Sequence, residues 1–411
     1  NNTAYGVSAL GADTKGDLSV AIGHSALSSQ NFTTNTDSYN VAVGASAGLS
    51  VTTGTNNTLV GGLAGDAIIT GEFNVAVGKD ALGSDTDGGY NVGIGALALS
   101  TQNFTTTTNS YNTAVGGLAG RRITTGLQNT LIGGQAGDHL TDADYNVAIG
   151  YGALTADTLG STSIAIGTNA LATQNFTTAT NAYNVAIGDS AGVAVTTGIK
   201  NTFIGGLAAD SNTIGFNNVA IGYDALGTNT ASGANVAIGY EALKTYNNTT
   251  EASHFNTAVG TQAGKAVTTG VSNTLVGGNA GDALTDADHN TAVGGGALTS
   301  DTLGSKSTAL GKNALYTQNF TTATDSFNVA VGHEAGLLIT TGVNNTLIGA
   351  IAGDALTDGL KNVAVGQNAL GADTQGDNSV AIGSNALCTQ NGTNGNVYNV
   401  AVGANAGFAM T

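Results

Sequence analysis

Hydrophobic and polar positions recur along the chain in a nine-residue pattern, which is clearest at residues 40–48, Asn-Val-Ala-Val-Gly-Ala-Ser-Ala-Gly. Each copy begins with Asn or Ser and continues with three apolar or small residues and a Gly. We call the stretch from one such start to the next a rung. Successive starts are separated by 17, 21, 17 and 17 residues, and this order then repeats.

Four rungs make a 72-residue repeat, and we number the repeats 1 to 6 from their first residues, Asn2, Asn74, Asn146, Asn218, Asn290 and Asn362. The sixth repeat is incomplete. A fixed period of this length is the signature of a solenoid. We therefore expect residues 1–411 to form a single elongated repeat domain, which is a window cut from a longer or processed protein.

The beginning of each rung predicts a short β-strand. The second position is Val, Ile or Thr and the fourth is a large apolar residue in all 23 rungs, with Ala between them in most. Side chains alternate between the two faces of a strand, so both faces would be apolar or small. A Gly at the fifth position of every rung indicates a positive φ or a close backbone approach. An Ala at the eighth position of every rung indicates a tight corner.

The other columns complete the predicted coil. Asn starts 19 of the 23 rungs and Ser the other four, which predicts a ladder of side chains that bond one another or the local backbone. Thr fills the thirteenth position in fifteen of the sixteen 17-residue rungs, so we expect a second strand there, with one side facing water. The predicted fold is all-β, a parallel β-roll or β-solenoid of 17- and 21-residue coils.

The first strand carries no charge on either face, and a solitary roll would need one polar face. The simplest way to bury the second apolar face is against other copies of the same chain. We therefore expect a homo-oligomer, packed or intertwined as a trimer or assembled as a filament.

The motif Asn-Val-Ala-Ile-Gly-x-x-Ala-Leu, as at residues 146–154 and, with Ser at its first position, at residues 19–27, resembles the head repeat of trimeric autotransporter adhesins. It is also similar to repeats that precede a self-cleaving chaperone domain in phage tail-fibre proteins. The resemblance implies a left-handed parallel β-roll, a homotrimer and a place on a cell surface or virion. The coils are longer than those of the adhesins, and both families stay open.

Charge and composition exclude several classes. A net charge of −17 with only two Arg, Arg121 and Arg122, argues against nucleic acid as a partner. No apolar run is long enough to enter a membrane within this segment. The lone Cys388 rules out an internal disulfide framework. The five His are scattered through the repeat without a recurring partner and the repetition shows no local break, so we expect neither an enzyme nor a cofactor.

The 21-residue second rung carries an insertion, which we expect to be a display loop for a cell-surface glycan or protein. The alternative is that its aromatic rings fold back to cover the roll. The candidate residues are Asn31, Phe32, Tyr39, Asn103, Phe104, Tyr111, Asn175, Phe176, Tyr183, Asn319 and Phe320.

The same insertion holds an Asn-x-Thr sequon in all six repeats, and glycosylation there is a further hypothesis. The acceptors would be Asn31, Asn103, Asn175, Asn247, Asn319 and Asn391.

The pattern favours a structural fibre, the shaft or head of an extracellular adhesin or a phage tail fibre. A self-assembled, glycosylated extracellular filament is the alternative, and an ice-binding array of Thr is a third. Calcium at the Asp-rich turns, such as Asp138, Asp142 and Asp144, is a minor hypothesis, because calcium-binding rolls need their motif in consecutive coils.

Overall fold

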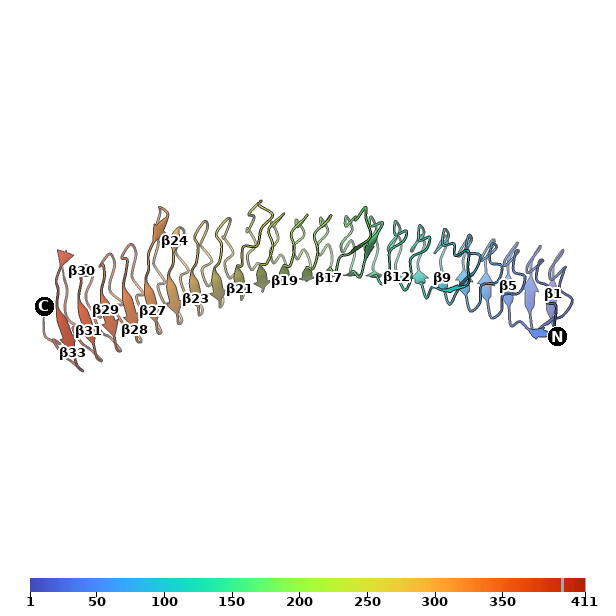
Figure 1. Ribbon diagram of the computed structural model, residues 1–411. Helices are drawn as coiled ribbons and strands as arrows, with labels where there is room; N and C mark the ends of the chain where they lie inside the picture. The colour runs from blue at the N-terminus through green and yellow to red at the C-terminus, as the bar shows by residue number, and fades with distance from the viewer. Residues whose placement is uncertain (393–394, 411) are drawn as a thin grey trace. The chain divides into compact units, whose positions relative to one another are not determined.

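The computed structural model describes residues 1–392 and 395–410 (Figure 1). The chain divides into two compact units, Asn1–Asn201 and Thr202–Thr411. The described residues of both units contain strands, turns and bends and no helix, so nothing in them could cross a membrane as a helix.

Each unit is a parallel β-solenoid in which one rung makes one coil, with about 23 coils counted over both units. A three-residue strand begins at the second position of each rung. In the first unit these are β1 (Thr3–Tyr5), β3 (Val20–Ile22), β5 (Val41–Val43), β6 (Thr58–Val60), β7 (Val75–Val77), β9 (Val92–Ile94), β11 (Thr113–Val115), β12 (Thr130–Ile132), β13 (Val147–Ile149), β15 (Ile164–Ile166) and β17 (Val185–Ile187).

In the second unit they are β18 (Thr202–Ile204), β19 (Val219–Ile221), β20 (Val236–Ile238), β21 (Thr257–Val259), β22 (Thr274–Val276), β23 (Thr291–Val293), β25 (Thr308–Leu310), β27 (Val329–Val331), β28 (Thr346–Ile348), β29 (Val363–Val365), β31 (Val380–Ile382) and β33 (Val400–Val402). Within a unit, neighbouring strands pair in parallel and in register, as Thr113 with Thr130 and Val115 with Ile132.

The fifth-position Gly is required for this stacking. Gly116 has a φ of 140°, and its N–H donates to the carbonyl of Ile94 at 2.7 Å. A Cβ added to Gly116 would lie 2.5 Å from the carbonyl oxygen of Gly133 in the next coil. Both the dihedral angle and the close approach therefore exclude a side chain.

The predicted ladder of Asn is confirmed. Asn74 is fully buried, its side-chain amide donates to the carbonyl of Gly88 at 2.9 Å, and its side-chain oxygen accepts the N–H of Asn91 at 3.0 Å. Asn74 thus gives a hydrogen-bond partner to one backbone carbonyl of its own coil and to one backbone N–H of the next coil, so neither buried group is left unsatisfied.

The expected second strand at the thirteenth-position Thr is wrong. The N–H of Thr124 donates to the carbonyl of Thr141 at 2.9 Å, its hydroxyl donates to the same carbonyl at 3.2 Å, and its own carbonyl accepts the N–H of Asn103 at 2.9 Å, yet Thr124 lies in a bend rather than a strand. The chain bends directly afterwards, so the Thr preference for strands is overridden by the turn.

The remaining strands are two residues long and lie beside the insertions, in the first and second rungs of a repeat. They are β2 (Gly16–Asp17), β4 (Thr36–Asp37), β8 (Gly88–Gly89), β10 (Thr108–Asn109), β14 (Gly160–Ser161), β16 (Thr180–Asn181), β24 (Gly304–Ser305), β26 (Thr324–Asp325), β30 (Gly376–Asp377) and β32 (Gly395–Asn396).

The core is narrow, and large and small residues alternate along it. Leu131 points inward from the third position of a fourth rung, where most rungs have Ala. The Leu131 side chain fills the space left by the ninth-position Gly of two neighbouring coils. A Cβ added to Gly120 would lie 2.7 Å from one of its methyl carbons, and a Cβ added to Gly137 would lie 2.8 Å from the other. First and second rungs instead carry Leu at the ninth position, as at Leu82 and Leu99. The large core side chain thus comes from the ninth position in two coils and from the third position of one coil in the next two. This alternation gives a physical reason for a period of four rungs.

The strand faces differ in exposure. The third-position Ala side chains, such as Ala114, are buried in the core, whereas the second and fourth positions point outward. Ile132 retains 38% of its accessible surface in the single chain, and Ile94 and Ile187 are similarly half-exposed. Each unit therefore presents rows of uncharged, mostly β-branched side chains along its sheet.

We expect Gly116→Ala to destabilise the first unit by roughly 3 kcal/mol or more, because it adds both a strained φ and a backbone clash. The adjacent Gly117 is a matched control, since a Cβ added there meets nothing within 4 Å. Thermal unfolding followed by circular dichroism compares the two variants. Equal melting temperatures for both would contradict the close-approach explanation.

Candidate display loops

The insertion of each second rung forms a loop on one coil. We call these segments the insertion loops, and they comprise residues 31–39, 103–111, 175–183, 247–255, 319–327 and 391–398. The last of them includes residues 393 and 394, which lie outside the described part of the chain.

A buried carboxylate fastens the loop in repeat 2. Asp85 is 1% exposed and accepts the N–H of Gly88 and the N–H of Phe104, both at 3.1 Å, and the side-chain amide of Gln102 at 2.6 Å. The Gln102 oxygen in turn accepts the side-chain amide of Asn112 at 2.9 Å. The loop is thereby connected to the Asn ladder through hydrogen bonds that water does not reach.

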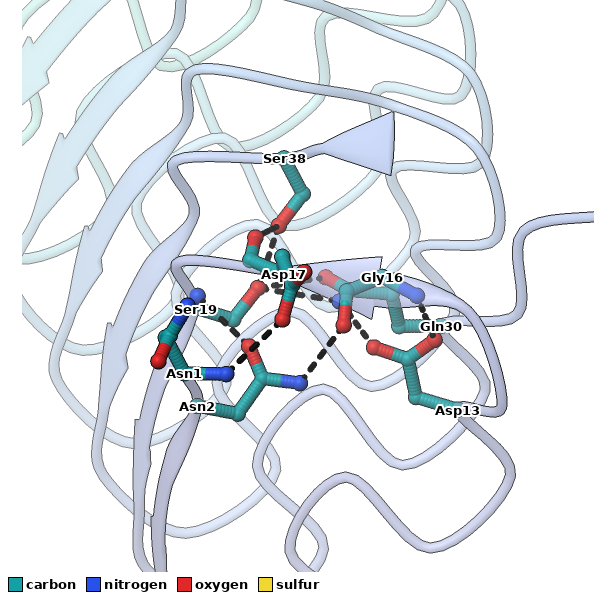
Figure 2. Close-up of polar contacts among 8 residues, drawn as sticks. All are labelled: Asn1, Asn2, Asp13, Gly16, Asp17, Ser19, Gln30 and Ser38. Carbon is teal, nitrogen blue, oxygen red and sulfur yellow. Dashed lines mark hydrogen bonds and ion pairs between the residues drawn. The ribbon is translucent and has the colours of Figure 1, made fainter. Parts of the chain in front are cut away.

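The same anchor recurs in other repeats, with Asp157 and Gln174, Asp301 and Gln318, and Asp373 and Gln390. Figure 2 shows the one in repeat 1, where Gln30 and the N–H of Gly16 donate to Asp13 at 2.7 and 2.9 Å.

The partners of the Asp85 and Asp301 carboxylates are N–H groups, among them the side-chain amides of Gln102 and Gln318. No ion pair to either carboxylate occurs among the described residues. Burial raises the pKa of both carboxyl groups above the ordinary 3.8, since desolvation of the charge outweighs the hydrogen bonds from Gln102 and Gln318 and from the backbone. The ionised carboxylate is therefore destabilised by burial, and each hydrogen bond that it accepts offsets part of that destabilisation.

The two kinds of loop aromatic lie in different environments. Phe32, Phe104, Phe176 and Phe320 are only 5% to 7% exposed. The ring of Phe176 packs over Gly160 in the preceding coil, where an added Cβ would lie 2.8 Å from it. The Phe rings therefore cover the roll, which explains the Gly beneath them.

Tyr39, Tyr111 and Tyr183, by contrast, are about half exposed, at 53%, 49% and 54%. If the loops bind a partner, the Tyr rings and the neighbouring polar groups are available for contact and the Phe rings are not. A binding role for the loops themselves stays a prediction.

These Tyr belong to a longer column that the sequence analysis missed. Every residue that precedes a rung start, from Leu18 to Tyr398, has a φ between 49° and 61°. In this column Phe73 stacks on Tyr90 with ring centroids 4.8 Å apart, and Tyr90 lies 5.2 Å from Tyr111. Comparing the residue that precedes each rung start across all rungs would have revealed these aromatic residues in the sequence. Although neighbouring rings partly cover one another, Phe73, Tyr90 and Tyr111 remain 42%, 41% and 49% exposed.

The sequon Asn side chains continue the thirteenth-position column. In repeat 2 the hydroxyl of Thr86 donates to the side-chain oxygen of Asn103 at 3.3 Å, which leaves the exposed Asn103 amide nitrogen as the group facing water. The five other acceptors make the same bond, namely Asn31, Asn175, Asn247, Asn319 and Asn391. Thr393, which completes the last sequon, is outside the described residues. Glycosylation stays a prediction.

The Asp-rich turn does not converge. Asp138 pairs with Arg121 at 2.9 Å, Asp142 accepts the hydroxyl of Thr125, and the Asp144 carboxylate accepts the N–H of Leu127. No group of three His, Cys, Asp or Glu that could hold a metal ion occurs in the part of the chain that the structure describes. These side chains tie neighbouring coils together, and they do not fit a calcium site.

One insertion loop is built differently, which corrects the expectation of an unbroken repetition. In repeat 4 the anchoring Asp and Gln are replaced by Asn229 and Tyr246, and the Ser or Ala near the end of the loop is replaced by His254. Tyr246 and His254 are both buried. Aligning the repeats in register shows this exchange, whereas counting His along the chain does not.

Comparison with protein-family models finds no match for this chain, and comparison with curated proteins finds none either.

We expect Gln102→Leu to loosen the loop at residues 103–111 by about 2 to 4 kcal/mol, because it leaves the buried Asp85 carboxylate and the Asn112 amide short of a partner. Hydrogen exchange of the peptide covering this loop measures the change. Gln128→Leu is the matched control, since Gln128 is exposed. Protection equal to that of the control would contradict the anchor.

Proposed function

We propose that this chain is a structural fibre segment, the shaft or head of an extracellular adhesin or a phage tail fibre. In this proposal three copies pack along the outward strand faces, and the insertion loops are displayed for surface attachment. The coils of 17 and 21 residues in a 72-residue super-repeat would place one loop on every fourth coil.

The observation that carries the proposal is the half-exposed apolar row on the sheet of each unit. The three-residue strands contain no charged residue at any position. An uncovered row of Val and Ile of this length is costly in water, and burying it stabilises at about 25 cal/mol per Å².

Two further features support self-association through this face. Gly117, Gly278 and Gly295 follow the strands, and an added Cβ at any of them would meet nothing within 4 Å, so another backbone has room to approach closely. The net charge of −17 is carried outside the three-residue strands, so like charges would not oppose one another across the apolar rows. The resemblance of the rung motif to trimeric adhesin and tail-fibre repeats favours three copies.

Light scattering coupled to size exclusion tests this proposal. We expect the full chain to have three times its single-chain mass of 40.1 kDa. The double variant Ile94→Lys and Ile132→Lys should fall to the single-chain mass, because two charges on the face cannot be buried without partners. The control Thr105→Lys and Thr107→Lys adds the same charge to an exposed loop and should remain a trimer. A monomeric wild-type chain would rule out the proposed packing.

A second candidate is a filament whose insertion loops are glycosylated. The observation in its favour is that the sequon Asn side chains are at the surface, and that each makes its hydrogen bond through the side-chain oxygen, so a sugar on the nitrogen would leave that bond intact.

Peptide mass analysis of the protein from its native source tests this candidate. We expect added sugar mass on the peptides that contain Asn103 and Asn319. Asn109, which is exposed and lies outside a sequon, should carry none. Unmodified Asn103 and Asn319 would eliminate this candidate and leave the fibre proposal untouched.

A further inference from the structure

Repeat 4 contains a buried imidazole at the end of its insertion loop. His254 is 8% exposed and lies against Tyr246, with ring centroids 6.2 Å apart in an edge-on arrangement. The equivalent positions in repeats 1, 2 and 5 carry Ser38, Ser110 and Ser326, which do not titrate. The loop at residues 247–255 therefore has a titratable group where the others have none.

The two imidazole nitrogens of His254 differ in their hydrogen bonding. Nε2 lies 3.1 Å from the hydroxyl of Thr250, which also lies 2.8 Å from the side-chain oxygen of Asn248. Nδ1 is buried and has no hydrogen-bond partner among the described residues.

His254 has no ion-pair partner in the described part of the chain, where the paired imidazoles are those of His139 and His333. Its ring contacts Tyr246 of its own coil and the hydroxyl of Thr250 in its own loop. The nearby carboxylate of Asp288 acts on Tyr246, whose pKa is raised to about 12 mainly by burial. Burial lowers the pKa of His254 below the ordinary 6.5, because the charged ring is desolvated, and in that ring the enclosed Nδ1 would carry a proton without an acceptor.

The segment that His254 closes is held to the preceding coil by few bonds. The N–H of Gly233 donates to the carbonyl of Ala252 at 2.8 Å, and the N–H of His254 donates to the carbonyl of Gly233 at 3.0 Å. Gly233 and Ser253 form a single isolated bridge where other repeats have a two-residue strand pair. Tyr246 cannot reproduce the buried Asp and Gln anchor of repeat 2.

We infer that the insertion loop of repeat 4, residues 247–255, is an acid-released latch that protonation of His254 opens, while the equivalent loops stay closed. Opening would expose Tyr246 and free the backbone groups of Gly233 and Ala252. The latch gives one loop in the array a pH-dependent conformation, and it does not depend on the proposed packing of copies.

The direction of the effect follows from the lowered pKa. The open loop binds a proton near the ordinary 6.5, and the closed loop binds it only at lower pH. The stability of the closed form is therefore complete above 6.5 and is lost as the pH falls below it. The equilibrium constant for opening should rise by up to about tenfold per pH unit in that window.

Hydrogen exchange of the full chain at about pH 7.5 and about pH 5, corrected for the intrinsic dependence of exchange on pH, tests the latch. We expect the peptide covering residues 247–255 to lose protection on acidification. The peptides covering residues 103–111 and 319–327 are internal controls, and they should keep theirs. Unchanged protection at 247–255, or an equal loss in all three loops, would overturn the inference.

Two substitutions separate His254 from other acid effects. His254→Ser installs the residue of repeats 1, 2 and 5 and should abolish the acid response of the loop. His289→Ser removes an exposed imidazole and should leave the response unchanged. An acid response that persists in His254→Ser would refute the latch. If that variant fails to fold, the comparison of loops within the wild-type chain still decides the question.

Discussion

Hydrogen bonding from each coil to the next is the constraint on which the rest of the structure depends. Because every coil must present the same donors and acceptors at the same places, residues become fixed in columns. Gly116 and its equivalents permit the backbones to approach, and Asn74 bonds a backbone carbonyl on the far side of its own coil, that of Gly88. Contacts between neighbouring coils then supply most of the stability, as in other solenoids.

The narrow cross-section explains why the chain repeats over four rungs rather than one. Two coils with Leu at the ninth position are followed by two with Gly, whose missing volume is supplied by Leu131. In the first two coils the twelfth position holds the buried Asp85 and Gln102, whereas in the next two it holds the apolar Ile123 and Leu140. The polar pair is therefore available where the insertion needs an anchor.

The loops combine a rigid base with a variable surface. Phe104 is buried against the coil and Tyr111 is exposed. The surface of the loop that is accessible to a partner is therefore held in place by buried groups that a partner does not reach. Repeat 4 replaces the Asp and Gln anchor with Asn229 and Tyr246 and places His254 near the end of the loop, and in our inference His254 changes the response of the loop to acid. A regular scaffold can thus carry one loop of different chemistry without loss of register.

The sequence by itself determined the columns, because a period with no insertion between repeats forces equivalent residues such as Gly116 and Gly133 into the same place. It predicted the strand, the glycine bend and the Asn ladder. It could not decide that Thr124 lies in a bend, since that depends on where the chain turns between coils. Only the tertiary structure separated buried Phe104 from exposed Tyr111 and enclosed Nδ1 of His254, because burial depends on what the next coil places against each side chain.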